Sequence, residues 1–94
     1  MGYIICMAWK VELKKKAIKG MSKLPKNDKK HLVVLLKELE TLGPKRTDWP
    51  NYSPLGGSKY HCHLSYSWVA CWEETEKGIE IEVYYVGSRE GAPY

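Results

Sequence analysis

The spacing of the apolar residues changes along the chain, and this change constrains the fold more strongly than any other feature of the sequence. Between His31 and Leu42, five leucines recur at helical spacing and form an amphipathic stripe. After Lys59 the apolar residues alternate with polar ones, as is typical of strands with one buried face. Such a chain combines helices with a sheet.

The first half of the chain predicts one strand and two helices. Residues 9–13 alternate as a half-buried strand, and residues 14–24 change to helical spacing. Pro25 should end this first helix, and Asn27 or Asp28 offers an N-cap for the second helix, whose leucine stripe covers residues 31–42. Gly43-Pro44 should end the second helix, so the two helices form a hairpin.

The second half of the chain predicts an irregular segment followed by a three-stranded meander. Residues 45–58 contain two prolines and a Gly-Gly pair and are expected to form a long surface loop. The strands are expected at residues 59–64, 68–73 and 79–86, joined by tight turns. The sequence therefore predicts one small α+β domain over residues 1–94, with residues 1–8 as a loose leader. The expected order is β-α-α-β-β-β, with an antiparallel sheet and a helical hairpin packed on one of its faces.

The second face of such a sheet is expected to be exposed to solvent and available for chemistry. On the first strand of the meander, Cys62 shares one face with its apolar neighbours, and His61 and His63 share the other. On the last strand, residues 79, 81, 83 and 85 are expected on one face and residues 80, 82, 84 and 86 on the other. The middle strand leaves two assignments open, because either Val69 with Cys71 or the Trp68-Ala70-Trp72 set could face the core.

Charge is distributed unevenly along the chain. Residues 1–46 hold 12 Lys and Arg against 4 Asp and Glu, whereas residues 47–94 hold 3 against 7. This asymmetry is consistent with a polyanionic partner that binds the first half, and equally with a solvated, lysine-rich helix face.

The three cysteines, at positions 6, 62 and 71, are odd in number and form no Cys-x-x-Cys motif. A disulfide framework is therefore not expected, and a reducing, cytoplasmic location fits better. The apolar run at residues 3–9 is too short to span a membrane, and no basic segment precedes it as in a signal peptide.

His61 and His63 are the first candidates for chemistry, because residues two apart on a strand project from the same face. They fit acid–base catalysis, since imidazole titrates near neutrality, and they also fit polar residues on a solvated strand face. A metal site would need a third ligand, and Cys62 points to the other face, so neither a metal nor a cofactor is expected.

Three further side chains add to this candidate site. Arg89 follows the last strand and could hold a phosphate through two parallel hydrogen bonds, or else pair with Glu90 on the surface. Tyr94 could stack on a nucleobase. Trp68 and Trp72 project from one strand face and are either a stacking platform or part of the core.

The chain resembles the RelE/ParE superfamily of toxins from bacterial type II toxin–antitoxin systems, and most of all its RelE-like branch. The resemblance covers about Trp9 to Tyr94 and depends on the order and spacing of several short motifs. These are Trp9-Lys10-Val11-Glu12-Leu13, the Lys23-Leu24-Pro25 helix break, Leu55-Gly56-Gly57, Tyr60-His61-Cys62-His63-Leu64, and Tyr85-Val86-Gly87-Ser88-Arg89-Glu90 with the nearby Tyr94.

The resemblance implies an endoribonuclease, an mRNA interferase that cleaves mRNA on the ribosome and so inhibits translation. In this family the ribose 2′-OH attacks the adjacent phosphate, and the products are a 2′,3′-cyclic phosphate and a free 5′-OH. The implied catalytic residues are His61, His63, Arg89 and Tyr94. The implied RNA-binding residues are Trp68, Lys59, Lys14, Lys15 and Lys16.

The chain departs from the family pattern at two points. Histidines stand at positions 61 and 63, where well-known RelE toxins carry lysines, and an arginine expected near Trp68 is missing. Two alternatives therefore stay open: a ParE-like toxin that binds DNA gyrase, and a catalytically silent RNA-binding relative. The family also implies a cognate antitoxin as partner, and a toxin–antitoxin hetero-oligomer on operator DNA.

Overall fold

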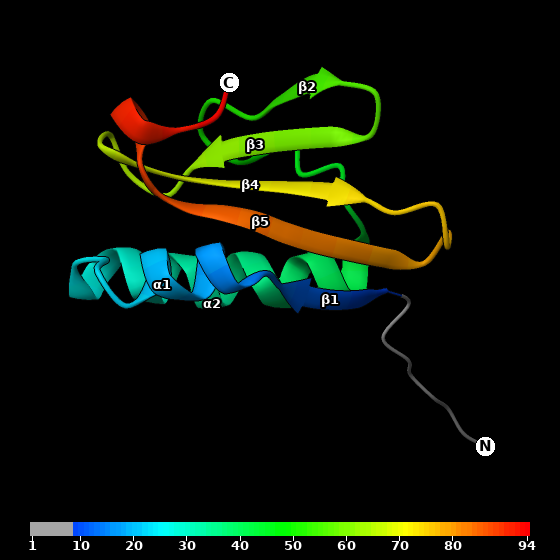
Figure 1. The fold of residues 1–94 in the computed structure, drawn as a ribbon, viewed down its shortest axis with the longest axis horizontal. Coiled ribbons are helices and arrows are strands. Elements are labelled where there is room, and N and C mark those ends of the chain that lie inside the picture. The colour runs from blue at the N-terminus through cyan, green and yellow to red at the C-terminus, as the bar shows by residue number, and fades with distance from the viewer. Residues whose placement is uncertain (1–8) are drawn as a thin grey trace.

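The structure of this protein is a computed structural model that describes residues 9–94. Within these residues a five-stranded sheet carries two helices along one side (Figure 1). The predicted leader, residues 1–8, lies outside the described residues. The elements in chain order are β1 (Lys10–Leu13), α1 (Lys15–Met21), α2 (Lys26–Leu42), β2 (Ser53–Gly56), β3 (Lys59–His63), β4 (Trp68–Glu74), β5 (Glu80–Ser88) and the short 3-10 turn η1 (Arg89–Gly91).

The strands lie in the order β1-β5-β4-β3-β2. Neighbouring strands are antiparallel except for β1 and β5, which pair in parallel. A parallel pair needs a crossover connection, and here the connection runs through both helices and the other strands. The predicted α+β class and the helical hairpin on one face are therefore confirmed, with one more strand than expected.

The additional strand is β2, which lies within the segment predicted as a loop. Its pairing with β3 shifts register between Pro54 and Gly56, and it lies at the edge of the sheet. An edge strand tolerates proline because one row of its N–H groups needs no partner. The prolines and glycines that predicted a loop thus mark an irregular edge strand.

The helix boundaries also differ from the prediction. α1 ends at Met21 rather than Leu24, and α2 begins at Lys26, directly after Pro25. Proline suits this position because the first N–H groups of a helix have no partner within the helix. Asp28 therefore lies in the first turn instead of serving as the N-cap.

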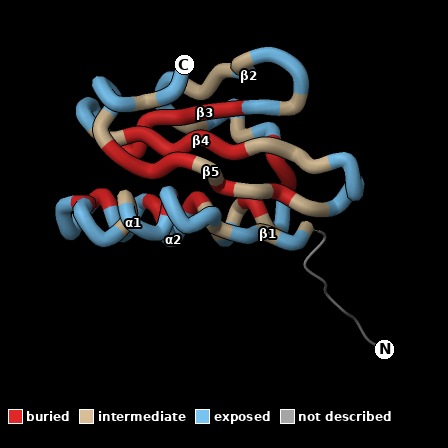
Figure 2. Tube along the Cα trace, in the orientation of Figure 1, coloured by how far each residue is buried: buried red, intermediate tan, exposed pale blue. Residues whose placement is uncertain are grey.

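The main core lies between the helices and the sheet. Leu32, Leu35 and Leu39 of α2 pack there with Trp72, and all four side chains are fully or almost fully buried. Buried stretches of β3, β4 and β5 form the middle of the sheet (Figure 2). The indole N–H of Trp72 donates a hydrogen bond of 2.9 Å to the carbonyl oxygen of Pro44. Ala70 and Trp72 thus occupy the core side of β4, which decides the face assignment that the sequence left open.

The opposite face of the sheet is covered, contrary to the expectation of a solvated surface. Val69 and Cys71 are fully buried there in a second, smaller cluster with Tyr85. The chain after β5 folds back across this face and packs Ala92 against the cluster (Figure 1).

A register shift in β5 corrects a second part of the face assignment. Trp72 pairs with Val83 and Cys71 pairs with Tyr85, so Tyr84 is an extra residue in a β-bulge. After the bulge the alternation is inverted. Tyr85 therefore joins the Cys71 cluster and Val86 joins the main core, the reverse of the faces predicted for them.

Gly20 determines how closely α1 approaches β5. A Cβ atom at this position would overlap the backbone carbonyl of Val86. We expect Gly20→Ala to destabilise the protein by about 1–3 kcal/mol through overpacking, although alanine is the better helix former by up to ~1 kcal/mol.

Urea unfolding of Gly20→Ala against the exposed substitution Lys15→Ala in the same helix measures this effect. Equal or higher stability of Gly20→Ala would show that α1 and β5 do not pack this closely.

Candidate active site

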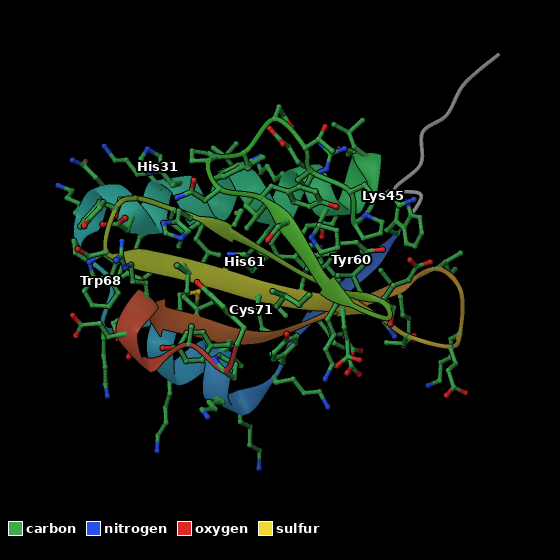
Figure 3. The ribbon with its side chains drawn as sticks, turned by 90° about the horizontal axis from the view of Figure 1, so that it is seen from above. His31, Lys45, Tyr60, His61, Trp68 and Cys71 are labelled. Atoms are coloured by element: carbon green, nitrogen blue, oxygen red, sulfur yellow. The ribbon has the colours of Figure 1, made fainter. Side chains whose placement is uncertain are left out.

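β3 carries both histidines to the face that the C-terminal segment covers. The register places His61 opposite Cys71 and His63 opposite Val69, and the two imidazole rings lie 6.0 Å apart. The predicted shared face is confirmed. The predicted exposure is wrong, because His61 and His63 are only 7% and 8% exposed. Figure 3 shows His61 within the sheet, apart from His31 on α2.

Backbone and side-chain contacts from the neighbouring segment hold each imidazole ring. Nδ1 of His61 lies 3.2 Å from Ser53 Oγ and 3.4 Å from the carbonyl oxygen of Ser53. Because a carbonyl only accepts hydrogen bonds, this contact favours the tautomer with the proton on Nδ1 and a free lone pair on Nε2. Nδ1 of His63 lies 3.4 Å from Asn51 Nδ2.

The environment of His61 favours its neutral form. Burial lowers the pKa of His61 below its usual 6.5, and the neighbouring His63 lowers it further, while the Ser53 carbonyl acts in the opposite direction. At neutral pH this imidazole is therefore unprotonated and able to accept a proton.

Tyr94 lies directly on His61, with 4.3 Å between the ring centroids, although it is 33 positions further along the chain. It is 54% exposed, so one side of its ring covers the imidazole and the other is open to solvent. Burial raises the pKa of the Tyr94 phenol, and the positive charge of Arg89 partly offsets this. The phenol is thus a hydrogen-bond donor at neutral pH.

The bulge in β5 places two tyrosines beside this cluster. Tyr84 packs against the cluster that contains Cys71, and burial raises the pKa of each to about 12. Burial likewise raises the pKa of Cys62 to about 12. Neither thiol is ionised at neutral pH, so a cysteine nucleophile is not available here.

Two lysines lie over these tyrosines. The ammonium of Lys59 is 5.7 Å from the Tyr84 ring centroid, and that of Lys16 is 6.0 Å from the Tyr85 ring centroid. Together with Tyr94 they line a cavity of about 500 Å³, named here the Tyr94 cavity. It is large enough for a nucleotide and brings Lys16 of the basic N-terminal half next to the sheet.

Arg89 lies at the end of β5, in η1, where its backbone N–H donates to the carbonyl oxygen of Ser67 at 2.8 Å. Its guanidinium lies over the ring of Tyr66, 4.6 Å from the centroid. No ion pair with Glu90 is present among the described residues. Arg89 borders a second hollow of about 230 Å³, together with Trp68 and Tyr66.

Three predicted RNA-binding residues lie away from the histidines. Trp68 packs against the main core, on the side of β4 opposite to Cys71, and Figure 3 places it at the end of the sheet. Lys14 forms a 3.3 Å ion pair with Glu82, which occupies its charge. Lys15 is exposed on α1 and makes no ion pair within residues 9–94.

The sequence interpretation missed four residues of the site: Asn51, Ser53, Tyr84 and Tyr85. Asn51 and Ser53 lie in the segment predicted as a loop, and no motif marks them. Asn51 has a positive φ of 53°, a conformation that asparagine tolerates better than most residues. The two adjacent tyrosines can face the same side only because of the bulge, which strict alternation does not predict.

The arrangement can accept a proton next to a bound anion. It contains a neutral imidazole, a second imidazole, a protonated phenol and lysines that line the adjoining cavity. Within the described part of the chain, no group of three or more His, Cys, Asp or Glu residues could hold a metal ion. The same residues contain no helix with the length and apolar character that a membrane span requires.

Comparison with solved structures identifies the fold. The archaeal RelE in its complex with RelB from Pyrococcus horikoshii superposes with a TM-score of 0.71 at 19% identity, over 92% of this chain and 100% of that one. YafQ in the Escherichia coli DinJ–YafQ toxin–antitoxin complex gives 0.73 at 16% identity, over 93% and 99%. A metal-bound toxin from Helicobacter pylori gives 0.69 at 24% identity, over 87% and 96%.

The structural neighbours are toxins of the RelE/ParE superfamily, and this chain has a RelE-like fold. The resemblance inferred from the sequence motifs is thus confirmed at the level of the fold. No protein-family model matches the chain, and no curated protein matches it in sequence.

The lowered pKa of His61 makes stability depend on pH. Between the folded pKa and the usual 6.5, the unfolded chain binds more protons than the folded one, so stability falls as pH drops from 7.5 through this window. We expect urea unfolding of His61→Asn to show a weaker pH dependence than the wild type. An NMR titration midpoint for His61 at or above 6.5 would contradict this expectation.

Proposed function

We propose that this protein is the toxin of a type II toxin–antitoxin system and acts as an mRNA interferase. One observation carries the proposal: a buried histidine pair, capped by an exposed tyrosine, lies on the helix-free face of a RelE-like sheet. The gyrase-binding and catalytically silent alternatives need no such group of titratable residues.

The proposed reaction is cleavage of mRNA by attack of a ribose 2′-OH on the adjacent phosphate. Nε2 of His61 takes the 2′-OH proton while the 2′-oxygen bonds to phosphorus, and the bond from phosphorus to the 5′-oxygen breaks. His63 in its protonated form gives a proton to the leaving 5′-oxygen. The products are a 2′,3′-cyclic phosphate and a 5′-OH. General acid–base catalysis of this kind contributes about 10²–10⁴-fold to the rate.

Fixed positive charge stabilises the phosphorane that forms during attack. Lys16 and Lys59 line the Tyr94 cavity, and the positive charge of Arg89 acts to lower the pKa of the Tyr94 phenol. In the proposal, Arg89 holds the scissile phosphate and Lys59 binds the neighbouring backbone. These cations take over the role that the family's two strand lysines would have, because the histidines provide proton transfer instead.

Tyr94 controls access to His61 in this scheme. Its ring covers the imidazole and its outer side is exposed, so the side chain must rotate away for substrate to reach Nε2. Once displaced, the ring can stack on a nucleobase beside the scissile phosphate.

The proposed partners are an antitoxin and the translating ribosome. Two structural neighbours are toxins held in complexes with RelB and with DinJ. An antitoxin here would present an acidic segment to the lysine-rich half, and the complex would bind operator DNA. Lys14 and Lys15, with the lysines of α2, would contact ribosomal RNA.

Induction in a bacterial host tests the proposed activity. Wild type should arrest growth and produce discrete cuts in mRNA by primer extension, whereas His61→Asn, His63→Asn and Arg89→Ala should each reduce cleavage by about 10²-fold or more. His31→Asn is the matched control, because His31 lies on α2 outside the site.

The outcomes distinguish the candidate functions. DNA-damage signalling with intact mRNA would indicate a gyrase-binding toxin. Normal growth with a folded, soluble protein would indicate a silent relative. Equal cleavage by wild type and the His61 and His63 variants would place the chemistry elsewhere.

Substitutions of Tyr94 test separately what its ring and its hydroxyl group contribute. We expect Tyr94→Phe to retain most of the substrate affinity, because the ring still stacks, and Tyr94→Ala to raise KM about tenfold through loss of stacking. Single-turnover cleavage of a labelled RNA, on ribosomes where these are required, measures both. Equal KM values for the two variants would show that the ring does not contact RNA.

A further inference from the structure

A groove of about 480 Å³ runs between α1 and the end of β5 and is not used by the proposed catalytic step. Lys16, Lys19 and Lys23 form one wall, and Trp68 borders the other side. Backbone from Val86 to Ser88 forms part of its lining. It is named here the α1 groove.

The three lysines of the α1 groove are free to bind an anion. They follow one side of α1 and the turn after it, spaced three and four residues apart. All three are exposed, and none forms an ion pair among the described residues, in contrast to Lys10 and Lys14. Three unpaired ammonium groups along one edge attract a chain of regularly spaced negative charges.

Trp68 provides a flat apolar surface in the same groove. It is partly buried against the core, which restrains its ring, yet it lines both the α1 groove and the hollow at Arg89. The indole N–H groups of Trp49 and Trp72 donate to Glu38 and Pro44, whereas that of Trp68 donates to no other described residue. A restrained ring with a free donor suits stacking on a base.

The α1 groove shares lining residues with the Tyr94 cavity and with the hollow at Arg89. It shares Lys16 and Tyr85 with the Tyr94 cavity, and it shares Trp68 and Ser88 with the hollow at Arg89. The α1 groove therefore adjoins both hollows, and an extended ligand that occupies one of them can reach it.

We propose that the α1 groove is a subsite for single-stranded RNA, which binds nucleotides flanking the scissile phosphate. Lys19 and Lys23 contact backbone phosphates, and Trp68 stacks on a base. The proposal rests on the ribonuclease function proposed above. Alternation of cations with an aromatic plane favours RNA over an acidic peptide, which would use the charges but not the ring.

Binding of a 2′-O-methylated RNA tests this subsite, because the blocked 2′-oxygen cannot attack. We expect the double variant Lys19→Ala, Lys23→Ala to bind a fluorescent hexanucleotide about tenfold more weakly than wild type. The slope of log affinity against log salt should shrink by about 0.7 for each lysine. A dinucleotide, which fills only the active site, should bind both proteins equally.

Lys29→Ala, Lys30→Ala is the matched control. It removes the same charge from exposed positions on α2 and should change hexanucleotide binding much less. Equal losses in the two double variants would overturn the subsite, because the effect would then be one of overall charge. Loss of binding to an oligoglutamate peptide, with RNA binding retained, would assign the groove to an acidic protein partner and also overturn the proposal.

Substitution of Trp68 tests the stacking contact separately. Trp68→Leu should weaken hexanucleotide binding about tenfold, and Trp68→Phe should restore most of it, because the smaller ring still stacks. Thermal unfolding of both variants checks that each is folded.

Equal binding by folded Trp68→Leu and wild type would show that the ring is not a platform. Failure of the wild type to bind RNA or to cleave mRNA in cells would instead reject the proposed ribonuclease function itself.

Discussion

Burial of β4 on both faces is the constraint on which the rest of the molecule depends. Val69, Ala70, Cys71 and Trp72 are all fully buried, so each side of this strand needs its own cover. The helices cover the side of Trp72, and the returning C-terminal segment with Tyr85 covers the side of Cys71. Because the histidines of β3 pair with this second side, they are removed from water as well. The neutral state of His61 at physiological pH is thus a consequence of how the sheet is packed.

The sequence predicted most of the fold, because its apolar periods are long and unambiguous. The leucine stripe of α2 and the alternation in β3 each specify the face that packs in the main core. Both assignments are correct except for Leu42, which is exposed at the end of α2. The predicted elements and faces were wrong where a local irregularity interrupts the apolar periodicity. The bulge at Tyr84 inverts the face of Tyr85 and Val86, and β2 is an edge strand whose proline and glycine read as a loop. The His pair was visible as a motif, but its burial depends on a segment some thirty residues later in the chain, which spacing alone does not reveal.

Charge and chemistry come from different parts of the chain and meet only in the folded protein. The acidic second half supplies the imidazoles and phenols, while the basic first half supplies Lys16 at the edge of the Tyr94 cavity. The close approach of α1 to β5 places Lys16 beside the sheet while its side chain stays exposed. Burial of an unpaired charge would be costly. The two buried imidazoles therefore lie on the same side of the sheet as lysines that remain exposed to solvent. Such an arrangement keeps proton transfer and phosphate binding on separate side chains.

The parallel pairing of β1 with β5 also bears on how the chain folds during synthesis. Lys10 pairs with Glu80, so β1 can pair only after about 70 further residues have been synthesised. Closure of so long a loop is entropically costly, and folds with such distant contacts form slowly. Because β5 lies between β1 and β4, a growing chain holds neither a complete sheet nor a covered histidine pair until β5 and the segment after it have emerged. A newly made molecule therefore leaves one edge of β4 unpaired and His61 uncovered until residues 80–94 have left the ribosome.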